Sequence, residues 1–106
     1  MFTINGEQWQ IKLCSIHHPM LQRSDGSLSI GACDDASKTI YLNGALRGNL
    51  LKKVLCHELT HAAMFSYNVE LSLEQEELLA ELIATYGEEI IDITNVLFYK
   101  LREKLA

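Results

Sequence analysis

The hydrophobic pattern of the sequence changes once, near residue 45, and this change restricts the fold more than any other feature. Before it, short runs of apolar and β-branched residues are separated by turn-forming residues, which is typical of strands. After it, apolar residues recur at spacings of three and four nearly to the end, which is typical of helices. The 106 residues are therefore expected to form one α+β domain, residues 1–106, with a small sheet followed by helices.

The first 43 residues are expected to form three or four strands of an antiparallel or mixed sheet. Asn5-Gly6 predicts a tight hairpin turn, because both central positions of such a turn need positive φ. The returning strand should run through Trp9. Residues 28–33 and 38–42 give two more short runs, joined by a polar turn.

Two helices are expected to complete the domain. The first should begin near Leu46 and end near Asn68, since asparagine tolerates the left-handed conformation found just past helix ends. Ser72 and Gln75 then fit a capping box, in which the hydroxyl and the amide each take up a free backbone N–H. This motif predicts the start of a second, long C-terminal helix.

The first predicted helix carries His57, Glu58 and His61 within an otherwise apolar stripe. Residues four apart project from one helix face, so His57 and His61 can place imidazole nitrogens on one metal ion. Glu58 leans toward the same side, too far round to ligate easily but well placed to hold a water. A metal lowers the pKa of such a water from about 15.7 toward 7, and a carboxylate then takes its proton. We therefore predict two ligands and a general base.

A catalytic zinc site needs a third protein ligand and one open position. The second predicted helix supplies four acids near its start: Glu74, Glu76, Glu77 and Glu81. If the helices are antiparallel, His61 lies roughly 9 Å before the turn and Glu77 roughly 7 Å after it, so their levels match. Glu77 is the preferred ligand, and Glu81 is expected to accept the remaining N–H of His57. The reverse assignment, and Cys33 from the adjacent strand, stay open as alternatives.

The stretch "HELTHA" followed by "EELLAELIATYGEEI" resembles the gluzincin-type metallopeptidases, most closely the short phage- and mobile-element-associated proteins of the ImmA/IrrE class. The resemblance covers roughly residues 28–92. It implies a minimal zincin-like fold, with His57, His61 and Glu77 binding one zinc ion and Glu58 acting as general base. It also implies that an edge strand, here residues 38–42, binds substrate backbone by strand addition.

The expected function is therefore that of a zinc-dependent metallopeptidase that hydrolyses peptide bonds in a peptide or protein substrate. A zinc-binding regulatory or interaction module of a phage or mobile element, without proteolysis, is the alternative, and an enzyme inactive until a partner completes its groove is a third. Iron, cobalt or manganese could occupy the same ligands. Five side chains compete to stabilise the oxyanion: His17, His18, Tyr41, Tyr67 and Tyr86.

Charge and composition limit the partners. The net charge is −5, and eight carboxylates without any Lys or Arg lie between Glu70 and Asp92. Direct binding of nucleic acid is not expected, since phosphate backbones are bound by basic surfaces.

The sequence also predicts a setting for the chain. Three cysteines without CxxC spacing, and an N-terminus unlike a secretion signal, predict a reducing, cytoplasmic environment. No run approaches the roughly 18 apolar residues of a membrane helix. Apolar residues on the last predicted helix suggest homo-oligomerisation through that helix: Leu97, Phe98, Leu101 and Leu105.

Overall fold

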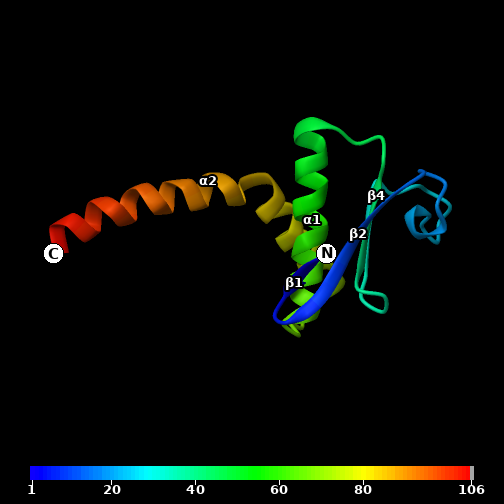
Figure 1. The fold of residues 1–106 in the computed structure, drawn as a ribbon, viewed down its shortest axis with the longest axis horizontal. Coiled ribbons are helices and arrows are strands. Elements are labelled where there is room, and N and C mark those ends of the chain that lie inside the picture. Colours follow the sequence, from blue (N-terminus) through cyan, green and yellow to red (C-terminus); the bar gives the residue numbers. More distant parts are fainter. Residues whose placement is uncertain (106) are drawn as a thin grey trace.

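The computed structural model describes residues 1–105 and has the predicted order of a sheet followed by two helices. Its elements are β1 (Phe2–Ile4), β2 (Glu7–Cys14), the 3-10 helix η1 (Pro19–Leu21), β3 (Gly31–Asp34), β4 (Thr39–Asn43), α1 (Gly48–Ser66) and α2 (Leu73–Leu105). Figure 1 shows α1 lying along the sheet and α2 leading away to the C-terminus. The predicted α+β class is confirmed.

The sheet is mixed, with strand order β1-β2-β4-β3. β1 and β2 are antiparallel, and Asn5 and Gly6 between them have φ values of 50° and 77°, so the predicted hairpin is confirmed. β2 pairs with β4 in parallel, and β3 pairs with β4 in antiparallel. The chain between β2 and β4 must therefore cross over, and it carries η1 and β3 on the way.

The prediction that residues 38–42 form an edge strand is wrong. β4 lies between β2 and β3 and is hydrogen-bonded on both sides, so the edge next to it is β3. Thr39 and Ile40 are fully buried, as expected for a strand inside a sheet. The position of a strand in the sheet depends on which strands it pairs with. Here β4 pairs with β2, which is distant in the sequence, and residues 38–42 alone do not predict that pairing.

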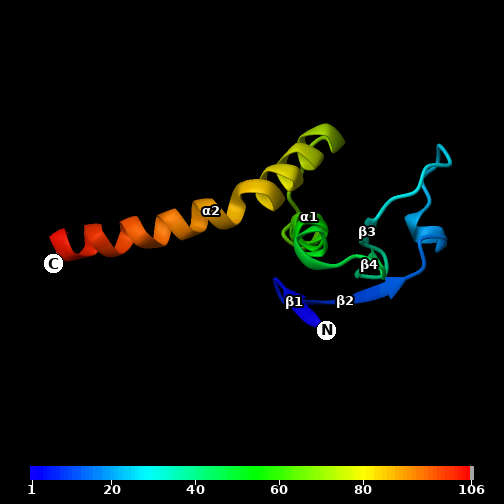
Figure 2. The same ribbon diagram turned by 90° about the horizontal axis from the view of Figure 1, so that it is seen from above.

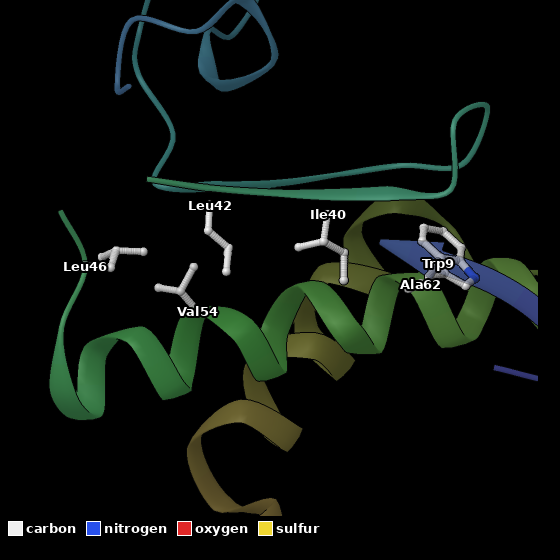
Figure 3. Close-up of a cluster of buried hydrophobic side chains, with 6 residues drawn as sticks. All are labelled: Trp9, Ile40, Leu42, Leu46, Val54 and Ala62. Atoms are coloured by element: carbon white, nitrogen blue, oxygen red, sulfur yellow. The ribbon is translucent and has the colours of Figure 1, made fainter. Parts of the chain in front are cut away.

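The core lies between the sheet and α1. Figure 3 shows side chains from both layers meeting there. The cluster is made of Trp9, Ile40, Leu42, Leu46, Val54 and Ala62. One face of α1 therefore packs on the sheet through its apolar side chains, and a neighbouring face is available to contact α2.

A buried hydrogen bond fixes the N-terminal hairpin to the end of α1. The indole Nε1 of Trp9 donates to Ser66 Oγ at 2.8 Å, and Asn5 Nδ2 donates to the Ser66 carbonyl at 2.9 Å. Trp9 is only 1% exposed, so its N–H has no access to water. Ser66 is the last residue of α1, and these contacts hold that end of the helix against the sheet.

The connection between the helices follows the predicted signals. α1 ends at Ser66, and Asn68 takes a φ of 54°, the left-handed conformation expected there. Gln75 N–H donates to Ser72 Oγ, and Ser72 N–H donates to Gln75 Oε1, both at 3.1 Å, so the capping box is confirmed. The short turn brings the first turns of α2 back alongside α1.

Only the first part of α2 packs on α1. Ala80 is completely buried there, and its small side chain permits a close approach of the two helices. Figures 1 and 2 show the rest of α2 projecting away from the sheet and α1. None of the helices described here combines the length and the hydrophobicity that a membrane span requires.

We expect Ser66→Ala to lower the free energy of unfolding by about 1–3 kcal/mol, because it leaves the buried Trp9 N–H without an acceptor. Urea denaturation measures this loss. In a Trp9→Phe background, which has no indole N–H, the same change should cost clearly less. Equal losses in both backgrounds would show that the hydrogen bond does not contribute.

Candidate metal centre

His57 and His61 lie one turn apart on the face of α1 that meets α2. Their ring centroids are 5.0 Å apart. His61 is buried, whereas the His57 side chain is 22% exposed. The two imidazoles thus stand side by side with one edge of the pair open to solvent.

Glu77 of α2 reaches both imidazoles. Its Oε2 lies 3.2 Å from His57 Nε2, and its Oε1 lies 3.0 Å from His61 Nε2. One ligand atom from each of these three residues lies within 4.8 Å of the others, so the group could hold a metal ion. The prediction that His61 and Glu77 lie at the same height along the two helices is confirmed. Glu81 is not part of the group that could hold the ion.

Carboxylates also lie beside the other nitrogen of each ring. Glu76 Oε1 is 2.7 Å from His61 Nδ1, a good hydrogen-bond distance. Glu81 Oε2 is 3.5 Å from His57 Nδ1, on the predicted side but at the distance of an ion-pair contact. An acceptor at Nδ1 holds the proton there and leaves Nε2 free to ligate a metal.

The two carboxylates differ in how they are held. Glu76 is mostly buried, with 18% of its side chain exposed. Glu81 is more exposed and also accepts from Lys53 Nζ at 2.9 Å. That hydrogen bond, rather than the more distant His57, is the main reason why the pKa of Glu81 is lowered. Glu76 is therefore the firmer orienting partner, a role that the sequence did not single out from its acidic neighbours.

Glu58 is buried beside the histidines, with 7% of the residue exposed. Burial raises the pKa of its carboxyl, while the nearby imidazoles of His61 and His57 act in the opposite direction. It lines the same cavity as His61 and Glu77 but is not among the residues that could share the ion. Its place next to that group fits a proton acceptor rather than a ligand.

Gly31 of β3 allows the edge strand to lie directly against Glu58. A Cβ at this position would lie 2.8 Å from Val54 Cγ1 and 3.1 Å from Glu58 Cγ. The first distance is shorter than real Cβ contacts, so any side chain here would push β3 away from α1. The spacing between the edge strand and the site thus depends on this glycine.

Two cavities flank the histidine pair. One, of about 330 Å³, lies beside Glu58, His61 and Glu76, and the other, of about 290 Å³, lies beside His57 and Glu81. Three residues line both of them: Arg23, Ser29 and Glu77. Both hollows therefore adjoin the candidate metal group, one at His61 and the other at His57.

None of the five candidates for oxyanion stabilisation lines either cavity: His17, His18, Tyr41, Tyr67 and Tyr86. His18 instead accepts the Met20 N–H at the start of η1, and its ring packs 5.2 Å from that of Tyr41. Arg23 lines both cavities and was not predicted. Its signal in the sequence was weak: it is the only Lys or Arg between Lys12 and Lys38.

Cys33 lines the larger cavity but is not one of the residues that could hold the ion. Burial raises the pKa of its thiol to about 12, and the nearby Glu58 adds to the shift. The thiol is therefore protonated at neutral pH in the metal-free chain. The geometry favours Glu77 over Cys33 as the third ligand.

The arrangement can supply two imidazole nitrogens and one carboxylate to an ion, a buried carboxylate beside them, and a cationic side chain across the cavity. A scan against protein-family models and searches of curated proteins and of solved structures found no match to this chain.

We expect Glu76→Gln to weaken metal binding about 10- to 100-fold, as is typical when the carboxylate that orients a histidine ligand is lost. Glu77→Ala should weaken it further, because it removes a ligand. Titration of the metal-stripped chain with zinc against a competing chelator measures both. Glu74→Gln, on the same turn of α2, is the matched control, and a loss there equal to that of Glu76→Gln would contradict the assignment.

We expect Gly31→Ala to be destabilising and to disturb the site, because its methyl group collides with Val54. Overpacking of this kind typically costs about 1–3 kcal/mol. Gly44→Ala is the control, since a Cβ there lies 3.6 Å from its nearest neighbour, an ordinary contact. Urea denaturation compares the two variants, and equal stabilities would show that β3 has room to move.

Proposed function

We propose that this protein is a zinc-dependent metallopeptidase in which Glu58 is the general base. One observation carries the proposal: the Nε2 atoms of His57 and His61 both face the Glu77 carboxylate, while Glu58 lies buried at the edge of the same cavity. Two imidazoles and a carboxylate suit zinc and leave a coordination position for water or substrate. Structural zinc sites, in contrast, are usually closed by four protein ligands.

The zinc ligands and Glu58 have separate roles in the proposed reaction. A bound zinc ion supplies Lewis acidity, which polarises a carbonyl group and lowers the pKa of water toward 7. Glu58 accepts the proton as the water attacks the peptide carbonyl carbon, and then delivers it to the leaving amine. The raised pKa that burial gives this carboxyl suits a group that must both take up and release a proton.

The edge strand β3 gives the substrate a place to bind. β3 is paired on one side only, with β4, and its residues Ala32 and Cys33 line the larger cavity. We propose that an extended peptide adds to the free side of β3 and runs between it and the start of α2. Backbone hydrogen bonds would then provide affinity, and the two cavities would receive side chains on either side of the cleaved bond.

Arg23 is the residue proposed to stabilise the oxyanion. Its side chain lines both cavities, and it is the only cationic residue to do so, because Lys53 lines the smaller one alone and is paired with Glu81. A guanidinium there can hold the negative charge that develops on the carbonyl oxygen.

We expect Glu58→Gln to retain zinc but to lose peptide hydrolysis by at least about 100-fold, the usual contribution of a general base. Zinc content by mass spectrometry and cleavage of a mixed peptide library report the two properties separately. Glu70→Gln, which changes an acid outside the site, is the control. A wild-type protein that binds zinc but cleaves nothing would favour a non-proteolytic zinc-binding module instead.

A further inference from the structure

The projecting part of α2 carries an apolar stripe with no partner among the described residues. Lys52, near the start of α1, pairs with Glu88 at 2.7 Å, and beyond this point Figures 1 and 2 show no other element beside α2. The stripe, called here the C-terminal stripe, comprises Gly87, Ile91, Thr94, Phe98, Leu101 and Leu105. Its large members are more than half exposed.

The spacing of the C-terminal stripe is that of a helix–helix interface. Its members alternate between steps of four and three residues, which is the seam of a two-helix coiled coil. Continued backwards, the same spacing reaches Ala84 and Ala80, and Ala80 is buried against α1. The face of α2 that packs on α1 therefore continues beyond the contact with α1, and Figures 1 and 2 show no element that covers it there.

Charge on the projecting part of α2 is separated along the helix, and at 3.6 residues per turn Glu88, Arg102 and Lys104 are the charged residues nearest to the C-terminal stripe. Its first half has the acids Glu88, Glu89 and Asp92, and its second half has the bases Lys100, Arg102 and Lys104 with one acid, Glu103. Two parallel copies would bring acids against acids and bases against bases. Two antiparallel copies would bring the acidic half of each against the basic half of the other.

We propose that α2 pairs with α2 of a second copy of this chain, antiparallel and with Val96 near the two-fold axis. In this register Ile91 lies level with Leu101 of the other copy, and the small residues Gly87 and Thr94 lie level with the large Leu105 and Phe98. Small residues thus face large ones at two of the three kinds of level, Ile91 and Leu101 pack together at the third, and the seam spans about 27 Å at 1.5 Å per residue. The two copies would use the same surface and be related by a two-fold axis, as in most homodimers.

A hollow at the junction of the two helices fits the end of the partner helix. A cavity of about 600 Å³ lies between α1 and α2, with Ile83, Gly87, Ile90 and Ile91 on its walls. Leu105 of the second copy is the residue that the proposed register brings to this level. The dimer would thus cover both the C-terminal stripe and an apolar hollow that are otherwise exposed to water.

Sedimentation equilibrium on the full chain tests the dimer. We expect twice the chain mass for the wild type and at least a tenfold rise in dissociation constant for Phe98→Asp. Ile93→Asp is the matched control, because Ile93 is similarly exposed but lies on the opposite side of α2. A wild type that is monomeric at every concentration, or a dimer that survives Phe98→Asp, would overturn the proposal.

Charge reversal tests the orientation. Changing Glu88, Glu89 and Asp92 to Lys should weaken the antiparallel dimer at least tenfold, and adding the reverse changes at Lys100, Arg102 and Lys104 should restore it. In a parallel dimer each half of the helix faces the same half of the other copy, so like charges would meet before and after each set of changes, and neither the weakening nor the recovery would be seen. Helical circular dichroism and zinc content, both unchanged, show that each variant is folded, so these outcomes do not depend on peptidase activity.

Discussion

The site depends on a polar contact between two helices, α1 and α2, that approach closely at the buried Ala80. His57 and His61 of α1 meet three carboxylates of α2, and Glu77 lies between the two Nε2 atoms. Polar groups at a helix interface are costly unless each has a partner, and each histidine nitrogen here lies within 3.5 Å of a carboxylate oxygen. An ion in this position would replace the imidazole–Glu77 contacts with stronger ones, without any need to move the helices apart.

The rest of the fold supports that contact from the other side of α1. Apolar burial fixes one face of α1 to the sheet, so the neighbouring face, with its histidines, can point only toward α2. Gly31 brings the edge strand close to Glu58 on the same side. The base, the ligands and the edge strand are thus set relative to one another by the packing of a single helix.

Local signals in the sequence were sufficient for much of this arrangement. The Asn5-Gly6 turn, the Ser72 capping box and the helical periods predicted the elements, and rise per residue alone matched His61 with Glu77. The edge position expected for residues 38–42 was wrong, because the parallel pairing of β2 with β4 joins segments far apart in the chain. For the same reason Arg23, which approaches the site from a distant loop, was missed.

The hydrogen bond between Trp9 and Ser66 has a consequence for folding. It joins residues 57 positions apart, so the β1–β2 hairpin cannot reach its final packing until the whole of α1 is available. Contacts of such high sequence separation carry a large loop-closure entropy and form slowly. The two helices, whose contacts are local, can therefore meet before the sheet is complete, and the histidine–carboxylate cluster would assemble on a helical hairpin ahead of the strand that flanks it.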